Sequence, residues 1–535
     1  MASSKPRTID DIFVLDRYQL LLMLFYEALV FTMLSNVVFN IFGTAHASLL
    51  GCDGSHFNGT QQEFCDMLRV VDCDKPMFEY EFYSTNVEFQ DICSPPTLLD
   101  DLLSKFGVKS KARFSTTLQM IGVIVGSAIA GQLSDLYGRK KITLLLLVCM
   151  VAFSTLSSFA PSMDFYVCMR FFIGIFCGGL TTVGTILVVE SLPAKHRLWM
   201  CTVVTWAPNY ILFAIFAYFT GHWRILARAC NVVTTFAVLL LAFGIPESPK
   251  FLVQKHRKSE AVRALIYVNS FRRDEGKFSE DEIDDVVDKA LAMTGEAERQ
   301  GKKKYTFVHL YATKSLAIRT IVLSFGMFSV SYITYGLIFN LHVIAGSLYW
   351  NTAFSGVLRW VVGSLVAVVD RLGGEFVGRK RLHFVTVSVV VACMACIFMI
   401  EFTGRTTEMV VVVRTLTLLA FGTTGCIFLQ FLLVTAELYP TAIRNLANSH
   451  INVCGRLGNV FGPLAFSLAE NHNSAADESS GIVGFPYLMM ATIGFLDILF
   501  FQFTLPETKG HPLPSRMPEK KKKADVESVN LIVKS

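Results

Sequence analysis

Twelve apolar segments, each long enough to cross a membrane as a helix, run through this chain of 535 residues. A bilayer core about 30 Å thick requires about 20 apolar residues, because a helix rises about 1.5 Å per residue. The apolar positions follow a helical period rather than the alternating segments of about ten residues found in outer-membrane barrels. We therefore expect an all-α membrane protein with twelve transmembrane helices. The segments are 20–42, 114–134, 142–160, 164–189, 199–219, 223–245, 317–340, 346–372, 382–401, 409–436, 445–469 and 482–505.

The composition agrees with this fold class and argues against several functions. Hydrophobic residues make up 53% of the chain and charged residues 17%, whereas a soluble chain carries about a quarter charged residues. The net charge of +5 comes from basic residues gathered at helix ends, which indicates topology rather than nucleic-acid binding. We find no secretory signal peptide, no phosphate-cradling loop, no His-Glu-x-x-His motif and no nucleophile elbow. The chain is therefore not expected to be an enzyme, and no catalytic residue, cofactor or metal site is expected.

Lysine and arginine in the short loops predict the orientation of the chain in the membrane. Four basic runs fall on one side of a twelve-span arrangement, and so does the basic tail. Because positively charged loops stay in the cytosol, both termini, 1–19 and 506–535, are expected there, and the loop 43–113 is expected outside the cell. The four runs are GRKK at 138–141, KHR at 195–197, QKHRK at 254–258 and GRKR at 378–381.

The predicted outer loop carries four of the thirteen cysteines and a glycosylation sequon at Asn58. An even number of cysteines beside a sequon indicates an oxidised, extracellular loop with disulfide bonds. Free thiols are the alternative, and the connectivity is open. The other nine cysteines lie in apolar segments, where a thiol behaves as a small hydrophobic group. The four loop cysteines are Cys52, Cys65, Cys73 and Cys93.

A polar stretch divides the chain into two related halves. Residues 246–316 are predicted to form a cytosolic linker with short amphipathic helices, between a first half, 20–245, and a second half, 317–505. The tripeptide GRK occurs in both halves at an offset of 240 residues, and a Glu and an Arg separated by six residues recur at an offset of 247. Two motifs at nearly one offset indicate a duplicated six-helix unit, with a central site where the halves meet.

Four stretches of the chain carry a resemblance to a known family. The run GQLSDLYGRKK at 131–141 is similar to the signature of the major facilitator superfamily. The cysteine-rich loop, IPESPKFL at 245–252 and AELYPTAIRN at 436–445 resemble the organic cation, anion and zwitterion transporters, a solute carrier family. The resemblance implies a multi-pass secondary transporter of the plasma membrane. Its partners would be a small organic ion, the lipid bilayer and a co- or counter-transported ion, with no nucleic acid.

The repeated motifs predict a charge network that gates the cytosolic end. Gly131 and Gly138 are expected to permit close helix approach and a tight turn, and Asp135 lies near a helix terminus. Opposite charges at the cytosolic helix ends of both halves can lock that end and must part when it opens. The alternative is that the basic residues only anchor the helices. The charged residues are Asp135, Arg139, Lys140, Glu190, Arg197, Arg379, Glu437 and Arg444.

Arg456 is the residue that most constrains the substrate. It follows the surface residue Arg444 by twelve positions, which places it about 18 Å into the membrane, near the midplane. A charge there costs at least ~2.5–3.5 kcal/mol, so the side chain must face a polar cavity or a buried partner. In the resembled family an arginine at this place marks anion and carnitine-type carriers, and a guanidinium fits a carboxylate in two-point fashion. The alternative is a buried pair with Glu27, Asp370 or Asp497.

Other polar and aromatic residues on the predicted helices are candidates for the same site. Asn36 and Asn40 share one helix face, although such groups also bond neighbouring helices. Aromatic walls suit flat organic substrates, with packing as the alternative role. Arg359 is a second deep cation that can instead reach towards the outside. The remaining candidates are Tyr332, Tyr335, Trp206 and Phe428.

Glu27 lies inside the first predicted span, where a carboxylate either takes up a proton or pairs with an arginine. Proton coupling through this residue is a hypothesis, and pairing is favoured. Taken together, the sequence predicts an alternating-access carrier of organic anions. The alternatives are a carnitine-like zwitterion carrier, an organic cation carrier, and a non-transporting membrane receptor with the carrier fold.

Overall fold

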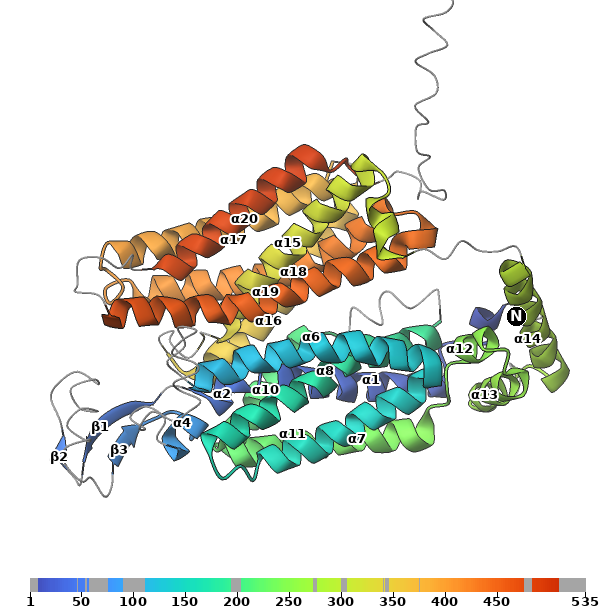
Figure 1. The fold of residues 1–535 in the computed structure, drawn as a ribbon, viewed down its shortest axis with the longest axis horizontal. Coiled ribbons are helices and arrows are strands. Elements are labelled where there is room, and N and C mark those ends of the chain that lie inside the picture. Colours follow the sequence, from blue (N-terminus) through green and yellow to red (C-terminus); the bar gives the residue numbers. More distant parts are fainter. Residues whose placement is uncertain are drawn as a thin grey trace, which may run out of the picture.

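The computed structural model describes residues 8–45, 47–52, 55–56, 76–89, 111–193, 204–272, 277–299, 306–339, 341, 346–374, 376–475 and 484–509. Its long helices form two groups that lie against each other (Figure 1). The first group contains α1 (Arg17–Val37), α6 (Lys111–Tyr137), α7 (Arg139–Ser157), α8 (Met163–Ser191), α10 (Trp206–Thr220) and α11 (Trp223–Leu239). The second group contains α15 (Lys314–Phe339), α16 (Leu348–Leu372), α17 (Arg379–Phe402), α18 (Val410–Leu438), α19 (Thr441–Ala475) and α20 (Phe485–Thr504).

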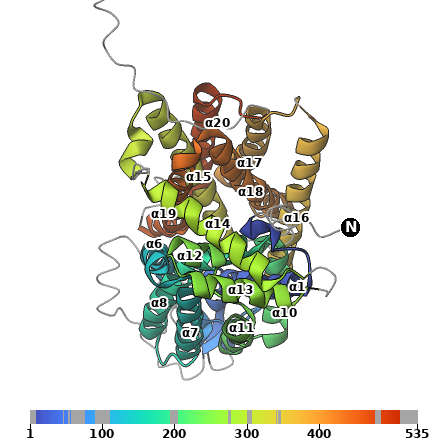
Figure 2. The same ribbon diagram turned by 90° about the vertical axis from the view of Figure 1, so that its right-hand side faces the viewer.

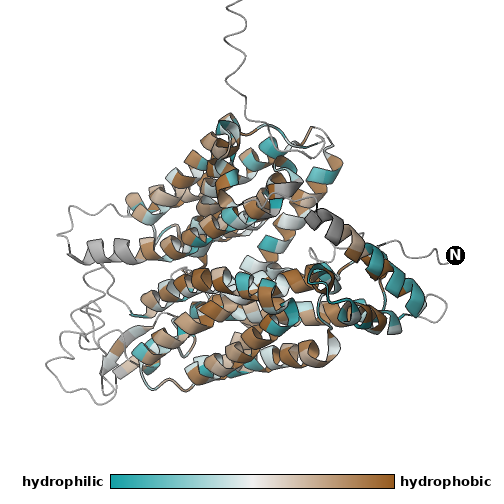
Figure 3. Ribbon diagram, turned by 45° about the vertical axis from the view of Figure 1, so that its right-hand side comes forward, coloured by the Kyte–Doolittle hydropathy of each residue, from teal (hydrophilic) through white to brown (hydrophobic). Residues whose placement is uncertain are grey.

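Ten helices among the described residues are long and apolar enough to cross a membrane. Each of them falls on one of the predicted apolar segments. The helices α10 and α19 are not among these ten, so the count of twelve spans stays a prediction. Figure 3 shows hydrophobic residues along the long helices of both groups and hydrophilic residues gathered on α14 (Glu280–Arg299).

The two ends of the molecule differ in structure. One end, here called the sheet end, carries a three-stranded antiparallel sheet of order β2-β1-β3, in which Gly51 pairs with His56. The expectation of an all-α protein did not include this sheet, because its strands are short and lie in a polar loop. Its elements are α2 (Asn40–Gly43), β1 (Ser48–Cys52), β2 (Ser55–His56), β3 (Pro76–Glu79) and α4 (Thr85–Glu88).

The opposite end, here called the linker end, carries the helices between the two groups. Figure 2 looks onto this end and shows α12 and α13 lying across the first group. The amphipathic helix α14 packs beside them. The N-terminal η1 (Ile9–Asp11) is tied to this bundle by a salt bridge of 2.5 Å from Lys250 to Asp10. The linker elements are α12 (Pro249–Gln254), α13 (Lys258–Ser270), α14 and η4 (Phe307–Tyr311).

Within each group, glycines allow two helix pairs to pack backbone against backbone. A Cβ at Gly126 of α6 would lie 1.8 Å from the main-chain oxygen of Ile175 in α8. In the second group, a Cβ at Gly458 of α19 would lie 2.4 Å from the main-chain oxygen of Phe328 in α15. Inside a membrane, close van der Waals packing replaces the hydrophobic effect as the force that joins helices. These contacts make each group a tightly packed unit.

The groups meet along two helix pairs, α10 with α16 and α6 with α19. A Cβ at Gly356 of α16 would lie 2.7 Å from the main-chain oxygen of Ala207 in α10. The ring of Tyr210 in α10 packs edge-on against Phe421 of α18 at a centroid distance of 5.8 Å. The candidate site lies beside this junction.

Candidate functional site

Arg456 joins the two groups from its position on α19. Its Nη2 donates a hydrogen bond of 2.9 Å to Oγ1 of Thr181 on α8, and the side chain is half-buried. Among the described residues, no salt bridge reaches Arg456. The positive charge of Arg456 is therefore met by a neutral hydroxyl and not by a carboxylate.

The three acidic partners considered for Arg456 have other neighbours. Asp370 accepts from Arg379 at 2.9 Å and from Lys509 at 2.8 Å. Asp497 faces His383 at 3.6 Å between its Oδ2 and the histidine Nε2, deep in the second group. Glu27 lies beside Asn209 of α10. A static internal ion pair is thus not the arrangement that the structure shows for Arg456.

Arg359 on α16 is a second cation at the junction. Its guanidinium lies over the ring of Phe421 at 5.2 Å and over Phe428 at 5.8 Å. Gly425 makes room for it, because a Cβ there would lie 2.5 Å from Cγ of Arg359. An aromatic face stabilises a cation without neutralising it. The charge of Arg359 therefore stays available to an anion.

Tyr335 on α15 is close enough to both arginines to feel their charges. It interacts electrostatically with both Arg456 and Arg359, and Tyr210 does so with Arg359. Four of the predicted residues, namely Arg456, Arg359, Tyr335 and Phe428, are thus brought together from α19, α16, α15 and α18. The sequence analysis missed Tyr210 and Thr181, which come from the first group, and no motif marks either of them.

Other predicted site residues are bonded to the protein itself. The amide of Asn40 donates to Ser115 at 3.0 Å and to Thr116 at 2.9 Å, and its oxygen accepts from Tyr166 at 2.7 Å. The amide nitrogen of Asn36 donates to the main-chain oxygen of Thr32. These contacts are the helix-bonding alternative considered for the two asparagines, and their role in binding stays a prediction.

The remaining predicted residues, Tyr332, Trp206 and Glu27, differ in their burial and in their contacts. Tyr332 is buried, its ring stacks on Phe328 at 6.0 Å, and its hydroxyl has no hydrogen-bond partner among the described residues. Trp206 begins α10 and is half-buried. In the part of the chain that the structure describes, Glu27 makes no salt bridge, so the favoured pairing with an arginine is not seen.

At the linker end of the first group, Arg139 anchors a charge network. It contacts Asp135 one turn earlier, and its Nε lies 3.9 Å from Glu190 of α8. Ser248 donates to Glu190 at 2.5 Å. Glu247 accepts from the main-chain nitrogen of Lys140 at 2.9 Å and thereby caps the start of α7.

The second group repeats this network. Arg379 binds Glu437 at 2.9 Å as well as Asp370, and Thr508 donates to Glu437 at 2.6 Å. Glu507 caps α17 by accepting from the main-chain nitrogens of Arg379 at 2.8 Å and Lys380 at 3.1 Å. The sequence analysis missed both capping acids. A repeated signal could have found them, because Pro-Glu-Ser at 246–248 and Pro-Glu-Thr at 506–508 follow the last helix of each half.

Two glycines predicted for this region behave differently. Gly138 has φ of +116°, which favours glycine, and a Cβ there would lie 2.4 Å from the carboxylate of Glu247. Gly131 is not a point of close approach, because its nearest neighbour would be Thr182 at 3.9 Å. Arg444 donates to the main-chain oxygen of Tyr439 at 3.3 Å. Arg197, Asn58, Cys65, Cys73 and Cys93 lie outside the described residues, and of Cys52 only the backbone, in β1, is described.

Contacts between the groups gather at the sheet end. The carboxylate of Glu81 accepts from the hydroxyl of Ser347 and, at 2.7 Å, from the main-chain nitrogen of Leu348, where α16 begins. The ring of Tyr349 stacks on Phe42 at 5.5 Å. The charge pairs at the linker end stay within their own groups. Among the described residues, the structure therefore shows the sheet end as the joined one.

Comparisons with known proteins place the chain among transporters. The model of a family described as "Sugar (and other) transporter" matches residues 73–516. Solute carrier family 22 member 15 of Xenopus tropicalis is 27% identical over 77% of this chain and 73% of its own length. Organic anion transporter 3 of Oryctolagus cuniculus is 27% identical over 75% of this chain and 70% of its own length.

A solved structure shares the fold. The xylose transporter XylE from E. coli, in a partially occluded inward open conformation, superposes with a TM-score of 0.61. It is 17% identical, and the match covers 93% of this chain and all of the other. The expected resemblance to the major facilitator superfamily and to organic ion carriers is confirmed by these matches.

Proposed function

This chain belongs to the sugar and other transporter family, and from that premise we propose that it carries small organic anions across the plasma membrane by alternating access. Its relatives are transporters and not enzymes. The observation that carries the anion preference is the pair of arginines at the junction of the two groups. Neither Arg456 nor Arg359 has a carboxylate partner among the described residues.

The energetic argument rests on the cost of an unpaired charge. A guanidinium deep in the membrane is costly unless a polar cavity, a partner or a ligand receives it. A substrate carboxylate or sulfonate supplies the missing negative charge and offers two acceptor oxygens to the planar fork. The aromatic faces of Tyr335 and Phe428 suit an organic body attached to that acid. Thr181 holds Arg456 in place when no substrate is bound.

The proposed membrane arrangement follows the positive loops. Twelve spans place the linker end and both termini in the cytosol, and the sheet end outside the cell. The four loop cysteines form disulfides there, and Asn58 carries a glycan. In this arrangement the joined sheet end is the closed outer side. The charge networks around Arg139 and Arg379 lie at the cytosolic side, where the halves approach each other when the site faces outward.

Radiotracer uptake in a heterologous cell tests the proposal. A labelled aromatic carboxylate should be taken up, and a quaternary ammonium should not. Arg456→Gln should lower carboxylate uptake by about tenfold or more, because a hydrogen bond to a charged group contributes about 1.5–3 kcal/mol. Arg405→Gln, at an exposed arginine of the second half, is the matched control and should leave uptake unchanged. Surface biotinylation normalises both variants.

Two outcomes would reject the anion proposal. One is undiminished carboxylate uptake by Arg456→Gln, and the other is uptake of the quaternary ammonium alone, which would indicate an organic cation carrier. Ligand binding without uptake, at normal surface expression, would indicate a receptor.

A carnitine-like zwitterion carrier is the second candidate, and Glu27 favours it. This carboxylate makes no salt bridge among the described residues, so it can receive an ammonium while an arginine receives the acid. Uptake of labelled carnitine by the wild type and by Glu27→Gln separates the two candidates. The same variant tests proton coupling, since an unchanged dependence of uptake on external pH would exclude that role.

A further inference from the structure

A groove of about 450 Å³ lies between α7 and α11. Figure 1 shows both helices on the side of the first group that faces away from the second group. Each of them is long and apolar enough to cross a membrane. The groove therefore opens towards lipid, and none of its residues belongs to the substrate site at the junction of the groups.

Most of the length of the groove is apolar. Val232, Phe236 and Leu239 follow one another along α11 at helical spacing, and their side chains are exposed. From residue 232 to residue 239 the helix rises by about 10 Å. At the floor, the amide nitrogen of Asn231 donates to Oγ1 of Thr155 in α7 at 3.0 Å, which fixes the two helices to each other. The groove thus offers a bed for a hydrocarbon chain.

A positive charge lies at one end of this bed. Arg228 is exposed and lines the groove five residues after Trp223, which begins α11. The indole nitrogen of Trp223 donates to Glu88 of α4 at 2.6 Å, so this is the sheet end of the helix. Five residues correspond to about 7.5 Å, and a long side chain at that depth can reach the layer of lipid headgroups.

The guanidinium of Arg228 is held in place but not neutralised. Its Nε donates to Oγ of Ser158 at 3.3 Å, and its central carbon lies 4.5 Å from the centroid of the Phe159 ring. The nearby carboxylate of Glu88 binds Arg224 at 2.6 Å, and among the described residues no salt bridge reaches Arg228. An aromatic face stabilises a cation without removing its charge. The charge is therefore left for a ligand.

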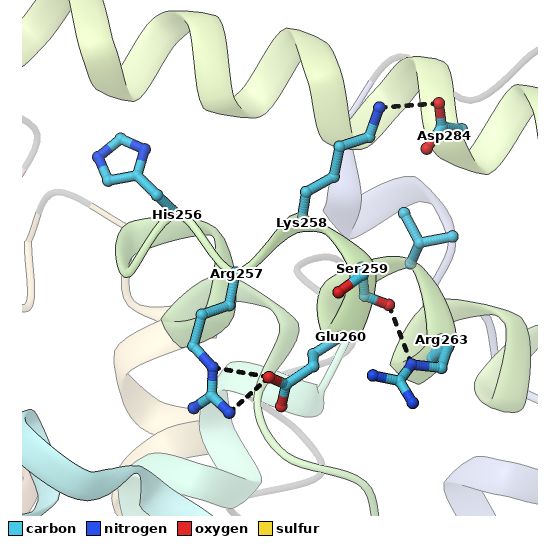
Figure 4. Close-up of a pocket in the computed structure, with 8 residues that line it drawn as sticks. His256, Arg257, Lys258, Ser259, Glu260, Arg263 and Asp284 are labelled. Carbon is cyan, nitrogen blue, oxygen red and sulfur yellow. Dashed lines mark hydrogen bonds and ion pairs between the residues drawn. The ribbon is translucent and has the colours of Figure 1, made fainter.

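The basic pocket on the linker differs in this respect. It has a volume of about 730 Å³ and lies where α12 passes into α13 (Figure 4). There Arg257 binds Glu260 at 2.5 Å, and Lys258 binds Asp284 at 2.9 Å. These two cations already have carboxylate partners, whereas Arg228 has none among the described residues.

We propose that the groove binds a glycerophospholipid, with the phosphodiester on Arg228 and one acyl chain along Val232, Phe236 and Leu239. The planar guanidinium offers two parallel donors to the phosphate oxygens. The order of the groups along α11, with the charge at the membrane surface and the apolar side chains deeper, matches the order within such a lipid. A sterol brings only a hydroxyl group and leaves the positive charge unbalanced.

The test titrates the purified full-length chain in detergent with phosphatidylglycerol and counts bound lipids by native mass spectrometry. One lipid should bind more tightly than the others. Arg228→Gln should weaken this binding by about tenfold or more, because hydrogen bonds to a charged group are lost. Arg405→Gln, at an exposed arginine between α17 and α18, should leave it unchanged. Monodisperse elution of each variant shows that it is folded.

A second pair of variants tests the bed of the acyl chain. Val232→Trp should fill the groove and also weaken the tight binding, by about tenfold. Val411→Trp on α18 is the matched control, because Val411 is 71% exposed and Val232 is 70% exposed. A phosphatidylglycerol with a photoactivatable acyl chain should crosslink to α11 in the wild type, and the crosslink should be lost in Val232→Trp.

Three results would overturn the proposal. One is equal affinity of the wild type and Arg228→Gln for the tightest lipid. Another is equally tight binding of diacylglycerol, which has the acyl chains but no phosphate, and the third is equally tight binding of a sterol. Lipid binding is measured without transport, so each of these results leaves the anion proposal unaffected.

Discussion

At the residue scale, Glu507 shows how a single carboxylate secures a helix end. Burial alone would raise its pKa, but hydrogen bonds from the main-chain nitrogens of Lys509, Lys380, Arg379 and Thr508 outweigh burial and hold the pKa below the ordinary value of 4.5. A carboxyl group whose pKa is lowered on folding stabilises the fold above its unfolded pKa and loses that contribution as the pH falls through its folded pKa.

Glu507→Gln should therefore lower the free energy of unfolding by about 1 kcal/mol at pH 7, because the hydrogen bonds to a charged acceptor are weakened. The difference between variant and wild type should shrink as the pH falls below 4.5 and through the lowered pKa of the folded carboxyl group, where the wild type becomes protonated. Thermal unfolding in detergent at both pH values measures this. Glu408→Gln, at an exposed glutamate, should change nothing. An equal loss at both pH values would show that the negative charge of residue 507 does not stabilise this helix end.

The depth of a residue in the membrane could be predicted from the sequence, whereas its hydrogen-bond partners could not. Counting from Arg444 places Arg456 near the midplane, and the structure places its guanidinium at the junction of the groups. Its partner Thr181 lies 275 residues away in the sequence, and only the fold brings the two together. The hydrogen-bond partners of Asn40 within the first group likewise come from distant parts of the sequence, and its role in binding stays a prediction.

At the element scale, α16 offers a matched pair of glycines. A Cβ at Gly356 would lie 2.7 Å from the main-chain oxygen of Ala207. A Cβ at Gly363 would have no neighbouring atom within 4 Å. Gly356→Ala should push α16 from α10 and destabilise the protein by about 1–3 kcal/mol, as overpacking does. Gly363→Ala should be neutral or stabilise by about 0.5–1 kcal/mol through helix propensity. Thermal unfolding and uptake of both variants measure this. Equal effects of the two variants would show that the contact between α16 and α10 does not require a glycine at residue 356.

The cap on α16 is a second feature of this scale, because Glu81 and the helix belong to different groups. Glu81→Ala should shift the equilibrium toward a state that is open at the sheet end by about 5–30-fold, since a lost cap costs about 1–2 kcal/mol. Spin labels at Pro161 and Thr407 should then report a longer distance across the sheet end. Glu79→Ala, at a neighbouring exposed glutamate, is the control. An unchanged distance in Glu81→Ala would mean that the aromatic contacts of Tyr349 suffice.

Most long helices could be predicted because their signal is local. The segment 482–505 corresponds to α20 at Phe485–Thr504, and 409–436 corresponds to α18 at Val410–Leu438. The sheet was missed because β1 has only five residues, and its partner β3 begins more than twenty residues after it ends. Pairing across such a separation depends on the surrounding fold and leaves little trace in a short run of residues.

At the scale of the whole molecule, the proposed topology makes a direct prediction. If the sheet end lies outside the cell, Asn58 should carry a glycan, and enzymatic removal of N-linked sugars should raise the electrophoretic mobility of the wild type. Asn58→Gln should migrate like the enzyme-treated protein. Antibody tags on the two termini should be reached only after the cells are permeabilised. A terminal tag detected on intact cells would contradict the predicted orientation.

The arrangement of the helices in two groups could be predicted from the sequence. Which end of the molecule joins the two groups could not. The repeat of GRK with its later Glu and Arg predicts two related six-helix units. In the structure, the networks around Arg139 and Arg379 form equivalent ion pairs in the two groups. Which end is joined depends on weak contacts between the groups, such as those of Glu81 and Tyr349. In the proposed alternating access this balance shifts during transport, so one sequence would have to encode both arrangements.

The duplicated networks have a consequence for how the protein is put together. Among the described residues, each group builds its own network at the linker end from its own arginine, capping glutamate and hydroxyl donor, and none of these comes from the other group. A chain severed between Arg299 and Thr306 should therefore still yield two self-contained fragments. When the two fragments are expressed together in one cell as separate chains, they should associate and restore transport.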